Sequence, residues 1–194
     1  MNNPRESTDA HPAYRREGAH TLLEVTLDEV RQLFHSLDPA PFRQKDLDSA
    51  AEEYIVEAVG EIGQHGPLKL VFYLPTDAVG SEDARTLPAA VRNYFTYRSR
   101  QRGLTLRHTL RRGLGSLLVG ALFLALCLSL RQLIATSDWG AGTAIVGEGL
   151  LIVGWIALWR PVEIFLYDWW PILEDQRRFA WIARQAVEVR RRAG

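Results

Sequence analysis

The fourteen residues WRPVEIFLYDWWPI, Trp159 to Ile172, form the densest group of chemically versatile side chains in the sequence. They combine an arginine and two carboxylates, Glu163 and Asp168, with tryptophan and tyrosine rings. Such a group suits a ligand site, or the level at which a membrane-spanning helix meets water, where rings with a polar edge are enriched. The elements that hold the segment decide between these two interpretations.

The rest of the sequence shows little conventional catalytic or ligand-binding chemistry. The five histidines lack metal-ligand spacing, Cys127 is the single cysteine, and no phosphate-binding glycine loop or nucleophile-elbow serine occurs. Asp38, Asp46 and Asp48 could bind a cation, but helix capping and turn formation are the favoured roles. We therefore expect no catalytic residue, no metal and no cofactor, and we predict that the chain is not an enzyme.

Two apolar stretches are long enough to cross a membrane. Eighteen uncharged residues lie between Arg112 and Arg131, and at about 1.5 Å per residue they nearly cross a hydrocarbon core of about 30 Å. The second stretch, Trp139 to Trp159, carries one charge, Glu148. We predict transmembrane helices over residues 113–134 and 139–160, joined as an antiparallel hairpin by a turn-rich connection.

Arginine counts orient this hairpin. Seven arginines lie in residues 92–112, seven lie in residues 160–192, and Arg131 alone lies between the spans. Because positive charge is retained on the cytoplasmic side, we expect a multi-pass protein of the bacterial inner membrane with both termini in the cytoplasm. The basic helix predicted over residues 86–112 and the C-terminal tail would contact anionic lipid headgroups. Their position beside the spans makes nucleic acid the less favoured partner.

The N-terminal part of the chain predicts a small acidic α/β domain over residues 21–76. Residues 1–90 hold 16 acidic and 8 basic side chains, against 7 and 15 in residues 91–194. Strand patterns at residues 20–27 and 68–75 flank two helices with capping-box spacing, at 28–37 (Thr26 and Glu29) and 50–63 (Ser49 and Glu52), which gives the order βααβ. Two strands are marginal in water, so we expect the next helix, a partner or a second copy to complete the domain. The polar residues 1–20 are expected to be disordered.

Residues 161–194 predict an interfacial aromatic segment followed by a basic tail helix. Its apolar side would consist of Phe179, Ile182, Ala183, Ala186 and Val187. Such an amphipathic helix would lie on the membrane or dock on the acidic domain.

Charges inside the spans are costly in hydrocarbon, so Glu148 needs an explanation. Helical side chains lean toward their own N-terminus, so Arg131 and Glu148 would converge in an antiparallel hairpin, and we predict a polar pair there. The alternative is that Glu148 lies shallow and reaches water. Small residues that allow close helix packing recur in both spans: Ser116, Gly120, Ala121, Ala125 and Ser129 in the first, and Ala144, Gly147, Leu151 and Gly154 in the second.

The aromatic side chains around Trp159 are predicted to form a membrane-interface belt. Its members would be Trp139 on one face and Trp155, Trp159, Arg160, Tyr167, Trp169 and Trp170 on the other. A belt does not require Glu163 and Asp168, so we expect these two carboxylates to face protein, with the arginines of residues 92–112 as partners. Arg160 and Glu163 are also spaced to pair within a helix.

Three segments, DPAPFRQKDLD, AEEYIVEA and WRPVEIFLYDWWPI, resemble a group of small uncharacterised bacterial inner-membrane proteins, over most of residues 22–172. The resemblance implies a location and a topology, and no activity. The expected fold class is an α-helical membrane hairpin with a small N-terminal cytoplasmic α/β domain.

The leading functional hypothesis is a membrane-anchored interaction, scaffolding or sensing module with an unidentified protein partner. The alternatives are a homo-oligomeric pore or transporter accessory subunit that uses Glu148, and a membrane-interface enzyme.

Overall fold

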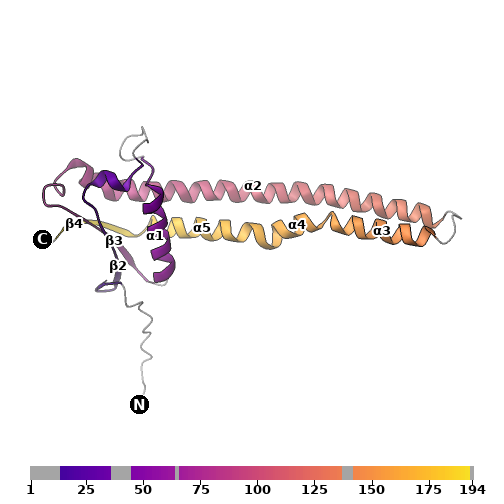
Figure 1. Ribbon diagram of the computed structural model, residues 1–194, viewed down its shortest axis with the longest axis horizontal. Helices are drawn as coiled ribbons and strands as arrows, with labels where there is room; N and C mark the ends of the chain where they lie inside the picture. Colours follow the sequence, from indigo (N-terminus) through magenta and orange to yellow (C-terminus); the bar gives the residue numbers. More distant parts are fainter. Residues whose placement is uncertain (1–13, 36–44, 64–65, 137–141, 193–194) are drawn as a thin grey trace, which may run out of the picture. The chain divides into compact units, whose positions relative to one another are not determined.

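The computed structural model describes residues 14–35, 45–63, 66–136 and 142–192, which fall into two compact units. The sheet unit comprises residues 1–99 and 177–194, and the hairpin unit comprises residues 100–176. Figure 1 labels the main elements, which follow in chain order. They are β1 (Arg16–Glu17), β2 (His20–Thr26), a 3₁₀ turn (Val30–Leu33), α1 (Ser49–Ile62), β3 (Leu68–Leu74), α2 (Glu82–Ala135), α3 (Gly142–Ile156), α4 (Trp159–Glu163), a π-helical segment (Ile164–Asp168), α5 (Trp169–Ile182) and β4 (Ala186–Arg191).

The sheet has the order β1-β2-β3-β4. β1 pairs with β2 antiparallel through a tight turn in which Gly18 has φ +61°, a conformation that suits glycine. β2 and β3 are parallel, with Leu23 beside Leu70, and α1 forms the crossover between them. β3 and β4 are also parallel, with Leu70 beside Val187, so their connection contains the whole hairpin unit.

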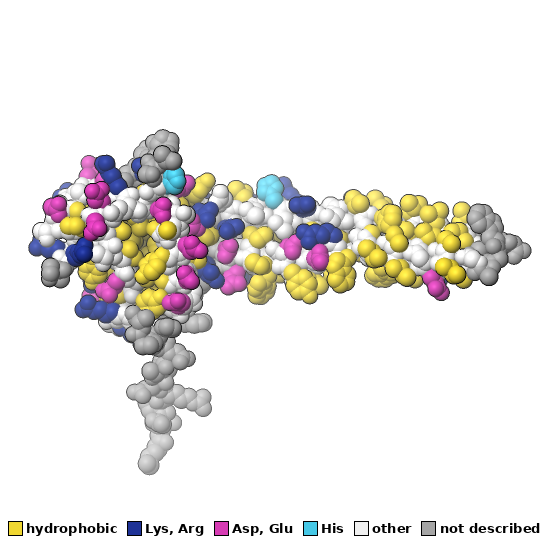
Figure 2. Space-filling model, in the orientation of Figure 1, with side chains coloured by type: hydrophobic (Ala, Val, Ile, Leu, Met, Phe, Trp, Pro, Cys, Tyr) yellow, Lys and Arg dark blue, Asp and Glu magenta, His cyan; other side chains and the backbone are white. Residues whose placement is uncertain are grey.

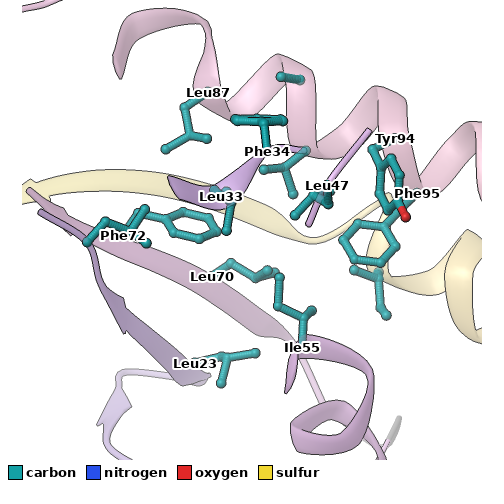
Figure 3. Packing of buried hydrophobic residues seen from close by; sticks show 14 of the residues in the cluster. Leu23, Leu33, Phe34, Leu47, Ile55, Leu70, Phe72, Leu87, Tyr94 and Phe95 are labelled. Atoms are coloured by element: carbon teal, nitrogen blue, oxygen red, sulfur yellow. The ribbon is translucent and has the colours of Figure 1, made fainter. Parts of the chain in front are cut away.

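One face of the sheet carries the hydrophobic core. Alternate residues of β2, β3 and β4 point to this face, where they meet α1, the first part of α2 and the end of α5. Figure 3 shows Leu70 and Phe72 of β3 close to Leu33 and Ile55, with Leu87 and Phe95 contributed by α2. Burial of each such large side chain stabilises the fold by about 1.5–3 kcal/mol.

A polar cluster connects three helices of the sheet unit. The Tyr94 hydroxyl donates to Glu52 Oε2, and Arg98 donates to Glu52 Oε1 from Nε at 3.0 Å and from Nη2 at 2.7 Å. The Arg98 guanidinium also lies 5.4 Å from the centre of the Phe179 ring, a cation–π distance. Burial and the bond to Glu52 both raise the pKa of Tyr94. Glu52 therefore holds α1 to α2, while Arg98 extends the contact to α5.

The predicted strands and the helix over residues 50–63 are present, but the helix predicted over residues 28–37 is wrong. Only a 3₁₀ turn forms, Val30–Leu33, and its capping residue is Glu29. After it, the backbone pairs with residues 46–48: His35 N donates to Asp46 O, and Asp48 N donates to Leu33 O, both at 2.9 Å. Asp48 caps α1, one residue before the predicted Ser49.

The tail predicted as a single helix is wrong after Ile182, because residues 186–191 form β4. Val187 and Val189 pack against the core while Glu188 and Arg190 point to the other face, a period of two that suits a strand. The Gln185 amide marks the change, donating to Trp181 O at 2.9 Å and accepting from Leu68 N at 3.2 Å. Of the two predicted locations for the tail, the structure therefore shows docking on the acidic domain.

The predicted disorder of residues 1–20 is wrong for residues 14–20, and residues 1–13 lie outside the described residues. Tyr14 donates to Glu61 Oε2 at 2.6 Å, which raises the Tyr14 pKa to about 12. The basic helix predicted over residues 86–112 and the helix predicted over residues 113–134 are parts of one continuous helix. α2 begins at Glu82, where Ser81 Oγ accepts from Ala84 N at 3.1 Å, and runs unbroken to Ala135.

We predict that Glu52→Gln lowers the free energy of unfolding by about 2 kcal/mol, because it removes the charge that Arg98 pairs with and replaces one acceptor oxygen by an NH₂ donor. The matched control is Glu53→Gln, an exposed neighbour on the same helix, which should have little effect. Thermal unfolding of the full chain in detergent measures both. Equal effects of the two changes would contradict the role assigned to Glu52.

Candidate membrane-interface site

Two helical stretches, Glu82–Ala135 and Ala144–Ile182, are long and apolar enough to cross a membrane. Their large apolar side chains point outward: only 17% of the most apolar eighteen-residue window in each is buried. Leu118, Leu122 and Ile145, for example, are 63%, 64% and 75% exposed. Figure 2 shows the apolar surface of the hairpin unit around the ends of α2 and α3 that lie near their connection. Core helices of soluble proteins bury such residues, whereas this pattern suits a lipid environment.

Glycines set the packing of α2 against the returning helices. A Cβ on Gly113 would lie 2.7 Å from Ile164 Cγ2, and a Cβ on Gly154 would lie 2.7 Å from Leu124 Cδ1. Apart from Ile164, the buried residues in this seam repeat every seven positions, the period of helices that pack as a left-handed coil. They are Gly113, Gly120 and Cys127 on α2, and Gly147, Gly154 and Pro161 on the return.

The predicted packing residues divide into two groups. Gly120, Gly147 and Gly154 belong to this seam, whereas Ala121, Ala125, Ser129 and Ala144 are exposed. Ser116 and Leu151 are half-buried. The list of small residues therefore contains part of the seam but does not separate its buried members from the exposed ones.

A proline shapes the start of the aromatic segment. α3 ends at Ile156, and α4 begins at Trp159 after a two-residue turn. Pro161 has no N–H to donate to the carbonyl of Ala157, four residues earlier. That carbonyl oxygen faces Gly120, where a Cβ would lie only 2.8 Å from it. The glycine therefore gives α2 the close approach that the turn requires.

Arg160 pairs with Glu163 and Asp168, the two carboxylates whose presence an aromatic belt does not explain. Its Nη1 lies 3.0 Å from Glu163 Oε2, and its Nη2 lies 3.1 Å from Asp168 Oδ2. Trp159 Nε1 donates to the other Glu163 oxygen at 2.9 Å. The Arg160–Glu163 pair was expected, but the partner of both carboxylates is this arginine rather than those of residues 92–112. Trp159, Arg160, Glu163 and Asp168 together form the Arg160 cluster.

The Arg160 cluster spans a π-helical segment, Ile164–Asp168. π turns are rare and occur often at functional positions. Trp169 Nε1 donates to Phe165 O at 2.7 Å, and the Trp169 and Trp170 rings meet edge to face with centroids 5.5 Å apart. Side-chain bonds thus support the backbone where the regular helix is interrupted.

Along the hairpin unit, the Arg160 cluster lies further into the apolar stretch than Arg111 and Arg112, the last arginines of α2 before that stretch. Arg102 Nη2 pairs with Asp175 Oδ2 at 3.4 Å, and Gly113 meets Ile164, so the two helices run antiparallel in a continuous register. Arg160 precedes Ile164 by four residues, about 6 Å of helix, in the direction of the apolar stretch. A charge at that level is costly unless it is paired, and the two carboxylates supply the pairing.

The predicted belt residues point outward. Trp155, Trp159, Tyr167 and Trp170 are exposed, and Trp169 is half-buried. Trp139 lies outside the described residues. In Figure 2 hydrophobic and charged side chains occur together along α4 and α5.

Arg131 and Glu148 are both exposed, and among the described residues no hydrogen bond or ion pair joins them. Arg131 instead packs on the return helix one residue earlier, since a Cβ on Gly147 would lie 3.4 Å from Arg131 Cγ. The predicted pair is therefore not formed, although the two side chains converge on neighbouring positions. The alternative, in which Glu148 lies shallow in the membrane and reaches water, stays a prediction.

Sequence reasoning missed the Glu52–Tyr94–Arg98 cluster and the seven-residue glycine repeat. The repeat was visible in the sequence, whereas the Glu52 cluster depends on how α1 meets α2. Of the aspartates for which capping or turn formation was favoured over cation binding, Asp48 caps α1, and Asp38 lies outside the described residues. Within the described ranges, no group of three His, Cys, Asp or Glu side chains could hold a metal ion.

Comparison of the chain with models of known protein families, with curated proteins and with solved structures finds no match in any of the three.

We predict that Gly120→Leu and Gly154→Leu destabilise the hairpin unit by about 1–3 kcal/mol or more, since neither site has room for a side chain. Gly115→Leu and Gly149→Leu are matched controls on the same helices, because a Cβ there would meet nothing within 4 Å. Thermal unfolding followed by tryptophan fluorescence compares the four variants. Destabilisation by the controls to the same extent would show that the seam is not the cause.

We predict that Arg160→Gln lowers the thermal stability of the chain, because it leaves two carboxylates without their cation. The triple change Arg160→Gln, Glu163→Gln and Asp168→Asn should recover most of this loss, since no charge then remains to be paired. Arg107→Gln, at an exposed arginine of α2, is the control. A triple variant less stable than Arg160→Gln would contradict this account of the cluster.

Proposed function

We propose that the protein is a two-span membrane protein in which the hairpin unit anchors the sheet unit, and that the sheet unit acts as an interaction module. The pairing of β3 with β4 is the observation that carries this proposal. β3 ends before the first apolar stretch and β4 begins after the second. Because the two strands pair in one sheet, both flanks of the hairpin must lie on the same side of a membrane.

The basic flank supports the orientation with both ends in the cytoplasm. Residues 92–112 of α2 carry seven arginines and no acidic residue, directly before the apolar stretch. Arg107, Arg111 and Arg112 are exposed, as contact with anionic headgroups requires. A bacterial inner membrane is the proposed location, because positive charge is retained there on the cytoplasmic face.

The packing of the hairpin unit favours an anchor over a pore. The glycine seam closes α2 on its partner, and the large apolar side chains face outward. Glu148, the residue that a pore would use, is exposed next to this seam rather than buried in it. The sheet unit by contrast has its own core, which is what a module that binds another protein requires.

Cysteine labelling tests the topology. In a Cys127→Ala background, Glu53→Cys on α1 and Arg191→Cys on β4 should react with a membrane-impermeant maleimide from the same side. Thr136→Cys, at the end of α2, should react from the opposite side. Right-side-out and inside-out vesicles give the two comparisons. Labelling of positions 53 and 191 from opposite sides would overturn the two-span proposal.

The interaction module is tested by capture. The full chain, solubilised from native membranes after crosslinking, should retain a protein partner that is lost when Gly120→Leu disrupts the anchor or when the charged surface of α1 is reversed. Loss of the partner with Gly115→Leu as well would contradict the proposal.

A further inference from the structure

The outer edge of β4 is the longest open strand edge in the described part of the chain. β4 has six residues, Ala186–Arg191, and pairs with β3 on one side. At the other end of the sheet, β1 covers the beginning of β2, where Leu22 N donates to Arg15 O at 2.8 Å. Open edges bind further strands unless something prevents it.

Hydrogen bonds show which β4 groups face outward. Arg192 N donates to Leu74 O at 2.8 Å, so even-numbered residues direct their backbone groups to β3. The N–H and C=O groups of Val187, Val189 and Arg191 therefore point away from the sheet. Among the described residues, none of these three has a backbone partner on that side. The edge thus presents three consecutive donor and acceptor positions.

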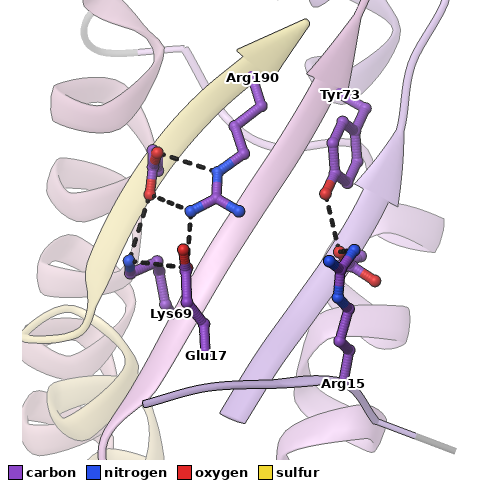
Figure 4. A network of polar contacts seen from close by, with 7 residues as sticks. Arg15, Glu17, Lys69, Tyr73 and Arg190 are labelled. Atoms are coloured by element: carbon purple, nitrogen blue, oxygen red, sulfur yellow. Dashed lines mark hydrogen bonds and ion pairs between the residues drawn. The ribbon is translucent and has the colours of Figure 1, made fainter. Parts of the chain in front are cut away.

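The side chains of β4 form an alternating charge pattern on the open face of the sheet. Figure 4 shows Arg190 and Lys69 close to Glu17, and Lys69 Nζ lies 3.2 Å from Glu17 Oε2 and 3.3 Å from Glu188 Oε2. Arg190 Nη2 lies 2.7 Å from Glu17 Oε2 and 2.9 Å from Glu188 Oε2. The bonds to Arg190, with smaller effects of Lys69, lower the pKa of Glu17 and Glu188. The two β4 charges are therefore held on one face in a fixed order.

We propose that two copies of this chain associate through their β4 edges, antiparallel about a two-fold axis at Val189. In this register Val189 lies opposite Val189 of the second copy, and Val187 lies opposite its Arg191. These are the outward-facing positions, and each such pair exchanges two backbone hydrogen bonds. A two-fold axis is the commonest symmetry of homo-oligomers.

Charge selects this register. With the axis at Val189, Glu188 of each copy lies opposite Arg190 of the other, in the closer, non-hydrogen-bonded type of pair. An axis at Glu188 would place two glutamates opposite each other, and an axis at Arg190 would place two arginines opposite each other. Opposite charges stabilise cross-strand pairs, and like charges destabilise them. The occupant that best fits the edge is therefore a second β4.

Charge reversal tests the pairing in the full chain, purified in detergent, with molecular mass measured by light scattering over a range of concentrations. The wild-type chain should form dimers. Glu188→Arg alone and Arg190→Glu alone should each weaken dimerisation about tenfold, because like charges then face each other across the interface. An equimolar mixture of the two variants should restore it, because each reversed charge then meets its complement. Glu53→Arg, an exposed position of α1, is the matched control and should dimerise as wild type does.

A monomeric wild-type chain would overturn the proposal, and the edge would then be open to a strand of another protein. Equal dimerisation of all variants would also overturn it, because the contact would lie elsewhere, as in the hairpin. Failure of the mixture to exceed the single variants would do the same.

Cysteines test the register even where a reversed charge impairs folding. In a Cys127→Ala background, a mixture of Glu188→Cys and Arg190→Cys chains should form the mixed disulfide, since opposite Cα atoms in such a pair are about 4.5 Å apart. Each variant alone should crosslink several-fold less. A mixture that crosslinks no better than the single variants would contradict the register. This proposal rests on the sheet edge alone, so the outcome of maleimide labelling leaves it unaffected.

Discussion

The pairing of β3 with β4 is the constraint on which the rest of the structure depends. It joins strands separated by roughly a hundred residues, and all of the hairpin unit lies between them. Closing such a connection is costly in chain entropy, although the cost grows only slowly with length. Burial of apolar side chains offsets this cost, because Val187 and Val189 complete the face of the sheet on which α1 and α2 pack. The acidic domain is therefore not an N-terminal domain with a membrane anchor attached. It is a unit built from both ends of the chain.

Two features stabilise the hairpin unit: glycines that allow the helices to approach closely, and charges that are paired within one segment. Its outward surface is apolar. In the proposed membrane setting the two helices gain little from excluding water and depend on close packing. Glycines at seven-residue intervals allow that approach, and at Gly120 they accommodate the carbonyl that Pro161 leaves without a helical donor. In the Arg160 cluster one arginine pairs with two carboxylates of its own segment, so no arginine from α2 is needed there.

Local sequence patterns predicted most elements. The predictions were wrong where contacts between distant residues determine the structure. The alternation in β2 and β3 and the periodicity of α1 are properties of short stretches, and the structure has these elements where they were expected. The segment after Val30 has helical spacing, but pairing of residues 33–35 with residues 46–48 limits it to one turn. β4 follows a helix without a strong break, and its two valines alternate for only four residues, so its identity depends on the neighbouring β3. The Arg160–Glu163 pair followed from spacing, whereas Asp168 is eight residues from Arg160 and needed the geometry of the π segment.

The place of β4 after the hairpin unit also sets an order of events during synthesis. A ribosome adds about 5–20 residues per second, so β3 emerges on the order of ten seconds before its partner strand. In that interval both apolar helices are made while the β3 edge stays open beside an incomplete core. In the proposed two-span topology, completion of the sheet requires that the second helix has returned the chain to its starting side. A chain whose second helix failed to return would be left with an unfinished sheet, and incompletely folded chains are the ones on which chaperones and proteases act.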